Sequence, residues 1–462
     1  MMHLTQVAHA TSGELAGVDV LIDRIVTDTR SDCGGGLFVA LSGDNFDAHD
    51  FIDQAETAGA AAVLIERAVR TSLPSIQVDN TLTALGRLAA WWRQQFDIPL
   101  MAITGSVGKT TVKEMLATIF ARQGEGIATK GNLNNEIGVP LTLLRLHKKH
   151  KYAVVEMGMN HAGEIHRLST MALPTIALVN NAAEAHLEGL GSVAAVAQAK
   201  GEIFDGLQDR GIAVINADDD YSDLWQEKTN GFKQILFGLS SNADVSATFK
   251  AGEDGQLVEI SGLQAPCCFQ LNALGEHSVR NALAAAAVAH AANVAVDDIA
   301  AGLEAFTAVE GRLNLESVGA VILIDDTYNA NPASMRAAID VLADYPNSLL
   351  ILGDMAELGV TAKEEHRALG AYADLKDIKH LYACGSYAQH VVDEFSGSGF
   401  AYADQEALID DLAGRIDSQI TDNQNNSLAV LVKGSRSAKM EKVVAAARQH
   451  LASISNDNLG AA

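Results

Sequence analysis

Short apolar runs alternate with amphipathic stretches along most of this chain, and the alternation predicts a protein built on parallel sheets. Parallel strands need crossover connections, so a repeat of strand and helix favours an α/β fold. In the middle region the predicted strands are Leu100–Thr104, Tyr152–Met157, Pro174–Asn180, Gly211–Asn216 and Gln234–Phe237. The helical patterns between them are Lys109–Arg122, Gly163–Met171, Ser192–Leu207 and Ser222–Lys228.

The rest of the chain divides around this middle region. Residues 243–272 are β-rich without an intervening helix, which predicts an antiparallel insertion or edge, and an Ala-rich helix is predicted at Glu276–Asn293. A second strand–helix series fills the last third, with strands predicted at Ala320–Asp325, Ser348–Gly353, His380–Cys384 and Ser427–Val432. Before residue 95 the elements are shorter and mixed. The changes of pattern predict three domains, at residues 1–95, 96–311 and 312–462.

The composition restricts the possible partners. The chain has 33 Lys and Arg against 58 Asp and Glu, a formal net charge of −25 at pH 7. Such a balance argues against a protein that coats nucleic acid or an anionic membrane. Any phosphate site must therefore be built locally, from a few cations and backbone amides. The sequence shows no signal peptide and no apolar stretch long enough to span a membrane. The scattered cysteines favour a reducing, cytoplasmic compartment, with adjacent Cys267 and Cys268 on opposite faces of a strand; the others are Cys33 and Cys384.

A glycine-rich segment, MAITGSVGKTT, leaves one predicted strand and enters the next helix. Its glycines let backbone N–H groups approach phosphate oxygens at a helix N-terminus, where Lys109 adds charge and Thr110 can bind Mg²⁺. The longer form of this motif has glycine where the chain has Ile103, so the match is to the shorter form G-x-x-G-K-T-T. The segment predicts a site for ATP and magnesium formed by Thr104, Gly105, Ser106, Val107, Gly108, Lys109, Thr110 and Thr111.

Three further residues could serve this site, although each has a plain structural explanation as well. Glu156 ends a predicted strand, where it is either a metal ligand or water-positioning carboxylate, or a solvated strand end. His186 follows another strand in a polar loop, and such histidines are most often surface residues. Lys200 lies in a helix, where a lysine commonly extends its ammonium to solvent. The sequence contains no nucleophile motif, so covalent catalysis by a side chain has no support.

In the order of its motifs the chain resembles the Mur ligase family of peptidoglycan synthesis. Within that family, Asn-Asn-Glu in GNLNNEIG and Tyr-Asn-Ala-Asn-Pro in DDTYNANP are typical of the member that adds a dipeptide. The ligases adding single amino acids, and folylpolyglutamate synthetase, differ at those places. The motifs that carry the resemblance are TGSVGKTT (104–111), GNLNNEIGVPLTLL (131–144), VVEMGMNHAGEI (154–165), NNAAEAHLEGLGS (180–192), AKGEIF (199–204), EHSVRNALAAAAVA (276–289), GRL (311–313), DDTYNANPASM (325–335), LGDMAELG (352–359) and VKGSRSAKME (432–441).

The resemblance implies both a fold and an activity. The expected domains are a small mixed α/β domain for the UDP-sugar, a central P-loop ATPase-like domain with a parallel sheet, and a C-terminal Rossmann-like domain for nucleotide and dipeptide. The implied reaction joins D-alanyl-D-alanine to the terminal carboxylate of UDP-N-acetylmuramoyl-tripeptide through an acyl phosphate, in the last cytoplasmic step of precursor synthesis. The implied cofactors are ATP, two Mg²⁺ and a carbamylated lysine. We expect a monomer with small-molecule substrates, no nucleic-acid partner and no membrane span.

The resemblance also implies roles for individual residues. The implied catalytic residues are Lys109, Glu156, His186 and Lys200. Metal binding is implied for Thr110, Glu156, His186 and a carbamylated Lys200. Nucleotide contacts beyond the phosphate loop are implied for Asn281 at the adenine, Arg312 at the phosphates and Asp325 or Asp326 at the ribose. The expected substrate contacts are Thr29, Arg30, Ser31, Asp47, His49 and Phe51 for the uridine diphosphate, Asn134 and Asn135 for the muramyl part, and Tyr328, Asn329 and Asn331 for the dipeptide.

Other functions stay open at this point. One is a nucleotide-dependent binding switch without ligation, against which the uridine-type motif at 28–51 argues. Another is a ligase of the same architecture that adds a single amino acid, or glutamate to folate. A third is an inactive homologue, although every matched position keeps a usable side chain. Phosphate release with D-Ala-D-Ala, compared with single amino acids, separates these functions.

Overall fold

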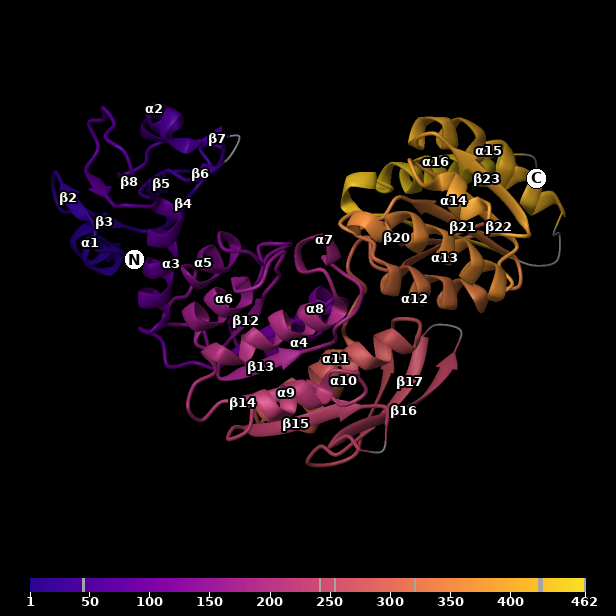
Figure 1. Ribbon diagram of the computed structural model, residues 1–462, viewed down its shortest axis with the longest axis horizontal. Helices are drawn as coiled ribbons and strands as arrows, with labels where there is room; N and C mark the ends of the chain where they lie inside the picture. Colours follow the sequence, from indigo (N-terminus) through magenta and orange to yellow (C-terminus); the bar gives the residue numbers. More distant parts are fainter. Residues whose placement is uncertain (44–45, 241, 253–254, 320, 423–426, 461–462) are drawn as a thin grey trace.

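The computed structural model describes residues 1–460 except 44–45, 241, 253–254, 320 and 423–426. The chain forms three α/β parts in sequence order, with the N-terminal and C-terminal parts on either side of the central part (Figure 1). This arrangement confirms the predicted fold class. Residue 95 lies between the strands of the first and second parts, and residue 311 between those of the second and third. The domain boundaries themselves stay predictions. Every helix in the described ranges is too short or too polar to cross a membrane.

The N-terminal part is a small mixed sheet in the order β2-β9-β8-β5-β4, in which only β2 is antiparallel to its neighbour. The strands are β2 Glu14–Ala16, β4 Ile25–Val26, β5 Leu37–Val39, β8 Ala62–Ile65 and β9 Ser75–Gln77, and the helices are α1 Leu4–Thr11, α2 Ile52–Thr57 and α3 Thr81–Arg93. Two short antiparallel pairs flank this sheet: β1 Met2–His3 with β3 Leu21–Ile22, and β6 Ser42–Gly43 with β7 Phe46–Asp47. A 3₁₀ turn spans Ala48–Phe51.

The central sheet has the order β11-β12-β10-β13-β14-β15-β16-β17-β18. It is parallel from β11 to β16, and the last two pairings are antiparallel, which confirms the antiparallel edge predicted for residues 243–272. The strands are β10 Leu100–Thr104, β11 Ile127–Ala128, β12 Ala153–Glu156, β13 Ile176–Val179, β14 Ile212–Asn216, β15 Lys233–Gly238, β16 Val245–Gly252, β17 Gly255–Ser261 and β18 Cys267–Leu271. In β18, Cys267 is buried and Cys268 exposed, as expected.

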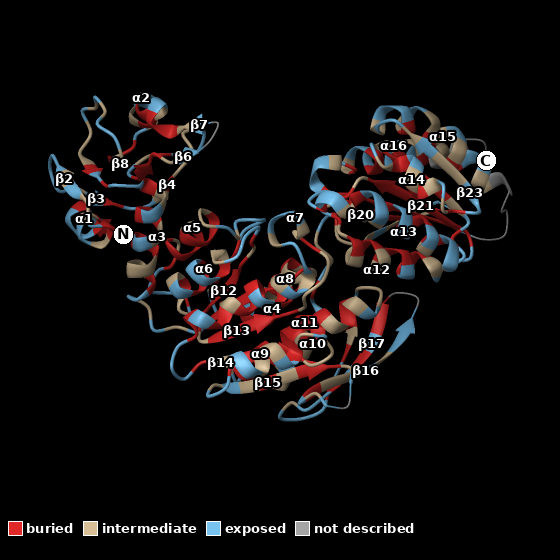
Figure 2. Cartoon of the chain, viewed as in Figure 1, coloured by how far each residue is buried: buried red, intermediate tan, exposed pale blue. Residues whose placement is uncertain are grey.

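Helices cover both faces of the central sheet, and Figure 2 shows its strands buried between them. Alternate residues of β10 enter different cores: Leu100 and Ala102 pack on one side, Met101 and Ile103 on the other. The Ala-rich helix α10 is almost wholly buried because its small side chains allow close packing against α4. The helices are α4 Lys109–Ala121, α5 Gly138–Leu143, α6 Glu164–Ala172, α7 Leu187–Leu190, α8 Val193–Gly201, α9 Ser222–Lys228, α10 Glu276–Ala291 and α11 Val296–Glu304.

The C-terminal sheet has the order β19-β20-β24-β21-β22-β23 and is parallel except for β19. Helices α12, α13 and α14 cover one face and α15 and α16 the other, as in Rossmann-like folds. The strands are β19 Asn314–Val318, β20 Val321–Asp326, β21 Ser348–Gly353, β22 His380–Cys384, β23 Ser398–Tyr402 and β24 Leu428–Lys433. The helices are α12 Pro332–Ala343, α13 Ala362–Leu375, α14 Ala388–Val392, α15 Gln405–Asp422 and α16 Glu441–Gly460. Ala320, predicted to begin a strand, lies outside the described residues.

One helix prediction was too long. The pattern over Ser192–Leu207 predicts a single helix, but α8 ends at Gly201 and a 3₁₀ turn follows at Glu202–Gly206. The Glu202 carboxylate accepts hydrogen bonds from the backbone N–H groups of Gly163 and His166 at the start of α6. Gly206 lies so close to Ser169 that a Cβ there would be 2.1 Å from its carbonyl oxygen. These contacts with α6 hold the last turn in its tighter form.

A buried arginine fixes the connection between the first two parts. Arg93 ends α3, and its guanidinium donates hydrogen bonds to the carbonyl oxygens of Ala172, Phe96 and Ile98. One of these oxygens belongs to the last turn of α6, where carbonyl groups lack helical partners. The Arg93 guanidinium therefore holds the segment between α3 and β10 against the end of α6 by hydrogen bonds.

Replacing this arginine should destabilise the protein measurably. We expect Arg93→Met to lower the free energy of unfolding by about 2–4 kcal/mol, because several buried carbonyl groups lose a charged donor. Urea denaturation followed by tryptophan fluorescence measures the change. Arg87→Met, at an exposed position of the same helix, is the matched control and should stay close to wild type. Equal stability of the two variants would contradict this role for Arg93.

Candidate nucleotide and substrate site

The glycine-rich loop lies between β10 and α4, as the sequence predicts. Gly108 has φ +81°, and a Cβ there would lie 2.2 Å from Oδ1 of Asn281 and 2.7 Å from Nδ2 of Asn180. The next strand over also fixes the loop: the Val107 N–H donates to Oδ1 of Asn181 at 2.9 Å. Glycine at 108 suits this loop backbone, because other residues rarely occupy left-handed φ values and their Cβ would collide with Asn281.

Lys109 and Thr110 begin α4 and face into the molecule. Nζ of Lys109 donates to the carbonyl oxygen of Gly105 at 2.6 Å, so the side chain lies along its own loop. Burial lowers the pKa of Lys109, and the carboxylate of Glu156 opposes that shift. The hydroxyl of Thr110 donates to Oε2 of Glu156 at 2.9 Å and accepts from the Arg312 guanidinium at 3.0 Å. Four residues from two parts of the chain therefore meet at this loop.

Glu156 reaches the loop because its strand is a neighbour of β10. The register pairs Ile103 of β10 with Glu156 of β12, at the carboxyl end of both strands. Its second oxygen, Oε1, accepts from Nδ2 of Asn134 at 2.8 Å. Because β10 and β12 are adjacent, Glu156 lies at the sheet edge beside the loop. Asn135 has a different place: its side chain accepts from the N–H groups of Ile137 and Gly138 at the start of α5.

His186 is half-buried and lies beside the C-terminal part. It has φ +56°, and its Nδ1 lies 2.7 Å from Oε2 of Glu357, which itself has φ +63°. The hydrogen bond from His186 lowers the pKa of Glu357. Two non-glycine residues in left-handed conformations therefore face each other across these parts, and backbone strain of this kind is concentrated at functional sites. Sequence reasoning missed Glu357 as a site residue, although it lies in the motif LGDMAELG.

Lys200 is buried rather than extended to solvent. Its side chain has 1% relative exposure, and it has no hydrogen-bond or ion-pair partner in the described part of the chain. Burial, with the nearby charge of Lys109, lowers its pKa well below the ordinary value. Asp219 is the nearest compensating carboxylate, but burial raises its own pKa and its oxygens accept from the N–H groups of Ala182 and Tyr221. Such surroundings disfavour the ammonium form of the amine.

Of the residues expected at the nucleotide, Asn281 and Arg312 lie at the loop, whereas Asp325 and Asp326 lie in the C-terminal part. Asn281 is buried against the loop, and its Oδ1 accepts from Nδ2 of Asn180 at 3.1 Å. Arg312 stacks on the ring of Tyr328 at 4.2 Å while its guanidinium reaches Thr110. Asp326 is paired with the buried Lys433 at 2.6 Å. Its neighbour Asp325 accepts from the hydroxyl of Thr327 at 2.7 Å and is half-buried. Of the two, Asp325 is therefore the better placed to meet a ribose.

In the N-terminal part, the expected substrate residues divide into exposed and buried groups. Arg30 is 90% exposed and pairs with Asp28, and Thr29 and Ser31 adjoin it. His49 instead has a fully buried ring: its Nδ1 lies 2.6 Å from Asp47, and its Nε2 accepts from a backbone N–H at 3.0 Å. Both ring nitrogens are thus engaged internally, so His49 fixes Asp47 in place. Phe51 stacks on Phe46 with ring centroids 5.1 Å apart.

The residues expected at the dipeptide lie at the carboxyl end of β20. Tyr328 lies under Arg312, and the carbonyl oxygen of Asn329 accepts from Nζ of Lys433 at 2.9 Å. Asn331 caps α12, where its Oδ1 accepts from the N–H of Ser334 at 2.8 Å. Asn followed by Pro is a common signal for a helix start, and it could have identified this cap.

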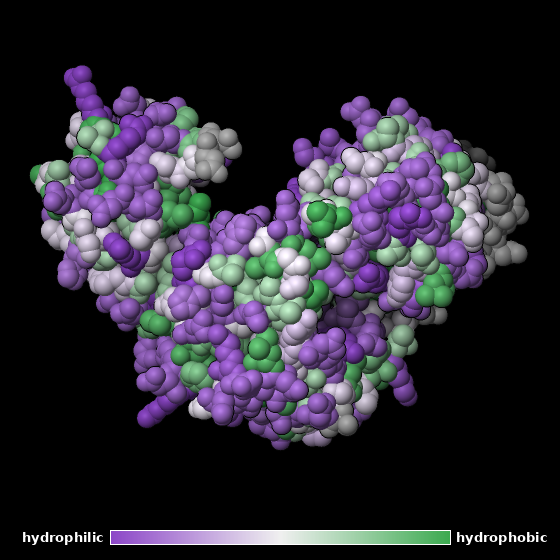
Figure 3. Space-filling model, in the orientation of Figure 1, coloured by the Kyte–Doolittle hydropathy of each residue, from purple (hydrophilic) through white to green (hydrophobic). Residues whose placement is uncertain are grey.

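The three parts of the chain leave a hollow on one face of the molecule. Figure 3 shows that the visible face of the molecule is hollowed between the N-terminal and C-terminal parts, and α7 lies at its foot (Figure 1). The structure joins Thr110, Glu156, Asn134 and Arg312 by hydrogen bonds, and the charge of Lys109 interacts with Glu156 and Arg312. The uridine-type residues lie apart from them, on the N-terminal part.

The fold and this loop define a P-loop protein of the α/β class. Family models match three stretches of the chain: the Mur ligase family catalytic domain at 21–93, the Mur ligase middle domain at 103–289 and the Mur ligase glutamate ligase domain at 311–436. The UDP-N-acetylmuramoyl-tripeptide–D-alanyl-D-alanine ligase of Escherichia coli is 44% identical over 451 residues, covering 97% of this chain and 98% of that protein. The chain belongs to the Mur ligase family.

Solved structures support the same relationship. The crystal structure I of MurF from Acinetobacter baumannii is 35% identical, with a TM-score of 0.90 over 96% of this chain and 97% of that one. MurF ligase from Thermotoga maritima, solved in complex with ADP, is 29% identical, with a TM-score of 0.81 over 93% and 97% of the two chains.

A single methyl group at the loop tests its geometry. We expect Gly108→Ala to weaken ADP binding by about tenfold or more, equivalent to about 1.4 kcal/mol, because the new Cβ collides with Asn281. Isothermal titration calorimetry with ADP measures the change. Gly231→Ala is the matched control, since Gly231 also has positive φ (+105°) but has no atom within 4 Å of an added Cβ. Unchanged ADP affinity in Gly108→Ala would show that the loop does not hold the phosphates.

Proposed function

We propose that the protein joins D-alanyl-D-alanine to the terminal carboxylate of a UDP-N-acetylmuramoyl-tripeptide, with ATP as the energy source. The products are the UDP-N-acetylmuramoyl-pentapeptide, ADP and phosphate. The observation that carries the proposal is the likeness to the Escherichia coli ligase along nearly the full length of both chains. The meeting of Lys109, Thr110, Glu156 and Arg312 at one loop supports it. We place the reaction in the cytoplasm, where ATP is available.

The chemistry follows from the inertness of a carboxylate. Its oxygen is a poor leaving group and its charge repels a nucleophile, so it must be activated before an amine can attack. Transfer of the γ-phosphoryl group gives an acyl phosphate, from which phosphate leaves when the dipeptide amine attacks the carbonyl carbon. This transfer depends on positioning and on neutralisation of charge, and needs no nucleophile from the protein. Lys109 and Arg312 are the cations that would bind the phosphate oxygens.

The donors at the loop suit magnesium. The Thr110 hydroxyl and the Glu156 carboxylate offer oxygen atoms, which Mg²⁺ prefers, and they lie 2.9 Å apart. Magnesium bound there would neutralise negative charge on the phosphates. Asn134 donates to the other carboxylate oxygen and so orients Glu156. We propose a second metal position that includes Glu156, His186 and a modified Lys200.

The modification proposed for Lys200 is a carbamate. A neutral amine adds to CO₂ to give R–NH–COO⁻ and releases one proton, so the side chain becomes an anion that could hold a metal. The support is the state of Lys200, a buried amine whose ammonium form is disfavoured and which has no partner among the described residues. Unmodified, this lysine would bear a desolvation cost that the charge of Asp219 offsets only in part.

The substrate contacts are assigned by part of the chain. We propose that Thr29, Arg30, Ser31 and Phe51 contact the uridine diphosphate and that His49 acts through Asp47. Asn134 would meet the muramyl part, and Tyr328 and Asn329 the dipeptide. For Asn135 and Asn331 we propose a supporting role, since Asn135 accepts from N–H groups at the start of α5 and Asn331 caps α12.

A phosphate-release assay tests the proposed activity. With UDP-N-acetylmuramoyl-tripeptide, ATP and Mg²⁺, phosphate should appear in proportion to pentapeptide when D-Ala-D-Ala is added. Single amino acids should give little phosphate, because the site is proposed to accept a dipeptide. Phosphate release with single amino acids alone would favour the alternative ligase, and slow release independent of any amine would favour a binding switch.

Lys200 provides a sharper test of the metal site. We expect Lys200→Ala to reduce kcat about 100-fold or more, because a charge-stabilising group at the phosphates is lost. Short-chain carboxylates such as formate or acetate should restore part of the rate if a carbamate is the missing group.

Lys228→Ala is the control for this variant, since Lys228 lies nearby on α9 but pairs with Asp205 at the surface. It should keep wild-type turnover. Full activity of Lys200→Ala would remove Lys200 from the proposed mechanism, whereas low activity without carboxylate rescue would remove the carbamate.

A further inference from the structure

A second cavity lies away from the phosphate loop, between the N-terminal part and the central sheet. Its volume is about 880 Å³, and residues of both parts line it. Ile127, which opens β11, is among them, and β11 pairs with β12 at Ala153, the first residue of that strand. The phosphate loop instead adjoins the last residue of β12, Glu156. The cavity therefore lies near the amino ends of these strands, opposite the edge that carries the loop.

One wall of this cavity is aromatic. Trp91 and Trp92 come from the end of α3, and Phe96 packs edge-on against Trp92 with ring centroids 5.3 Å apart. The indole N–H of Trp92 donates to the carbonyl oxygen of Leu146 at 3.0 Å, which fixes this ring against the central part. Ile25 of the N-terminal part lines the cavity as well. Planar apolar ligands suit such walls, because aromatic faces bury large area with little loss of side-chain freedom.

The lining also carries two cations without an acidic partner, although the chain has a net charge of −25. Arg145 is half-buried, and its guanidinium donates to the carbonyl oxygen of Ala128 at 3.2 Å. In the ranges that the structure describes, no carboxylate forms an ion pair with Arg145 or with the exposed Lys148. A half-buried guanidinium pays a desolvation cost that an anionic ligand would offset. Arg24, also in the lining, is instead paired with Asp23 and Asp32.

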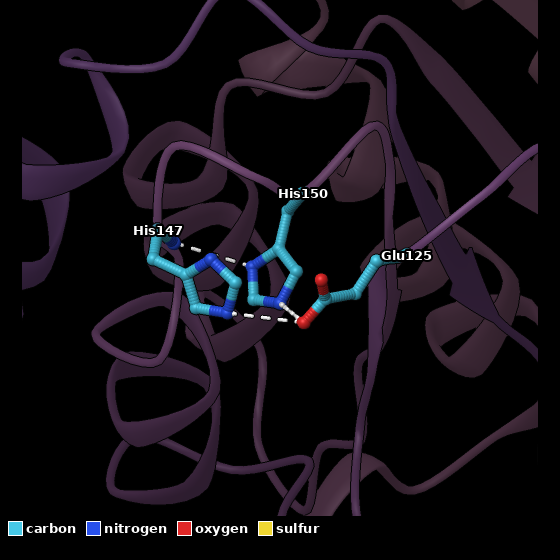
Figure 4. Close-up of side chains that lie close together, drawn as sticks. All are labelled: Glu125, His147 and His150. Carbon is cyan, nitrogen blue, oxygen red and sulfur yellow. Dashed lines mark hydrogen bonds and ion pairs between the residues drawn. The ribbon is translucent and has the colours of Figure 1, made fainter.

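Glu125, beside the cavity residues His147 and His150, is engaged by those two rings. Figure 4 shows His147 and His150 facing Glu125, with their Nε2 atoms 3.5 and 3.9 Å from Oε1. The Nδ1 atoms of both rings accept backbone N–H groups, at 3.3 and 3.2 Å respectively. A neutral imidazole that accepts a hydrogen bond at Nδ1 carries its proton on Nε2. In both rings this N–H faces Glu125, so neither nitrogen offers a free lone pair to a metal. The cluster is therefore a contact between two imidazole rings and a carboxylate, and Glu125 forms no ion pair with Arg145.

We propose that this cavity binds a small aromatic anion, with its ring against Trp91 and Trp92 and its charged group on Arg145 and Lys148. The site is separate from the proposed ligase site and does not depend on that activity. Because both parts of the chain line it, a bound ligand holds the N-terminal part against the central sheet. The chemical class is a planar aromatic ring that bears a carboxylate, sulfonate or phosphate.

Fluorescence titration of the full chain tests this proposal, with 8-anilinonaphthalene-1-sulfonate as the probe. We expect saturable binding of one probe per chain, with quenching of tryptophan emission. Arg145→Gln should weaken binding about tenfold, and the exposed Lys148→Gln, which should not disturb folding, should weaken it less. Arg122→Gln is the control, because Arg122 is an arginine of the central part outside the cavity and pairs with Asp298.

Competition and a neutral analogue complete the test. Saturating ADP should leave probe binding unchanged, because the phosphate loop lies at the other edge of the sheet. N-phenyl-1-naphthylamine, which lacks the sulfonate, should bind wild type and Arg145→Gln equally. Wild-type probe affinity in both Arg145→Gln and Lys148→Gln, or displacement of the probe by ADP, would overturn the proposal. These outcomes are independent of pentapeptide formation, so the cavity and the proposed ligase activity can fail separately.

Discussion

The contact of Thr110 with Glu156 and Arg312 is the interaction on which the rest of the site depends. It places a hydroxyl, a carboxylate and a guanidinium near the half-buried Lys109, in a chain that is otherwise strongly acidic. Local cations and backbone amides can attract phosphate groups in spite of the overall charge, because screening in salt limits repulsion to about 10 Å. The parallel pairing of β10 with β12 sets this contact, and the left-handed Gly108 lets the loop close beneath it.

The three parts are joined in different ways, and the difference matters for catalysis. A continuous apolar core runs from the N-terminal part into one face of the central sheet, and Arg93 reinforces it. The C-terminal part meets the central part through polar pairs, among them His186 with Glu357 and Arg336 with Glu184. Polar interfaces of this kind permit domain movement. An acyl phosphate must be shielded from water, and closure of the C-terminal part on the loop is the movement that could do so.

Strands and helices whose signals come from residues close together in the sequence could be predicted. The strand Leu100–Thr104 and the helix start at Lys109 lie where the pattern places them, because periodicity and glycine position are local signals. Contacts between distant segments could not be read in this way. The pairing of His186 with Glu357 depends on how two parts meet, and the burial of Lys200 depends on the packing around α8. The 3₁₀ turn after Gly201 has the same origin, since α6 imposes it.

Isotope transfer tests the central claim most directly, namely that the chain activates a carboxylate by phosphorylating it. The tripeptide substrate is labelled with ¹⁸O in its terminal carboxylate and converted with ATP and D-Ala-D-Ala, and the released phosphate is analysed by mass spectrometry. An acyl phosphate intermediate requires one carboxylate oxygen to leave with phosphate, so each phosphate released from doubly labelled substrate should carry one ¹⁸O. Unlabelled phosphate alongside full pentapeptide formation would contradict the account, because the carboxylate oxygen would then have left by another route.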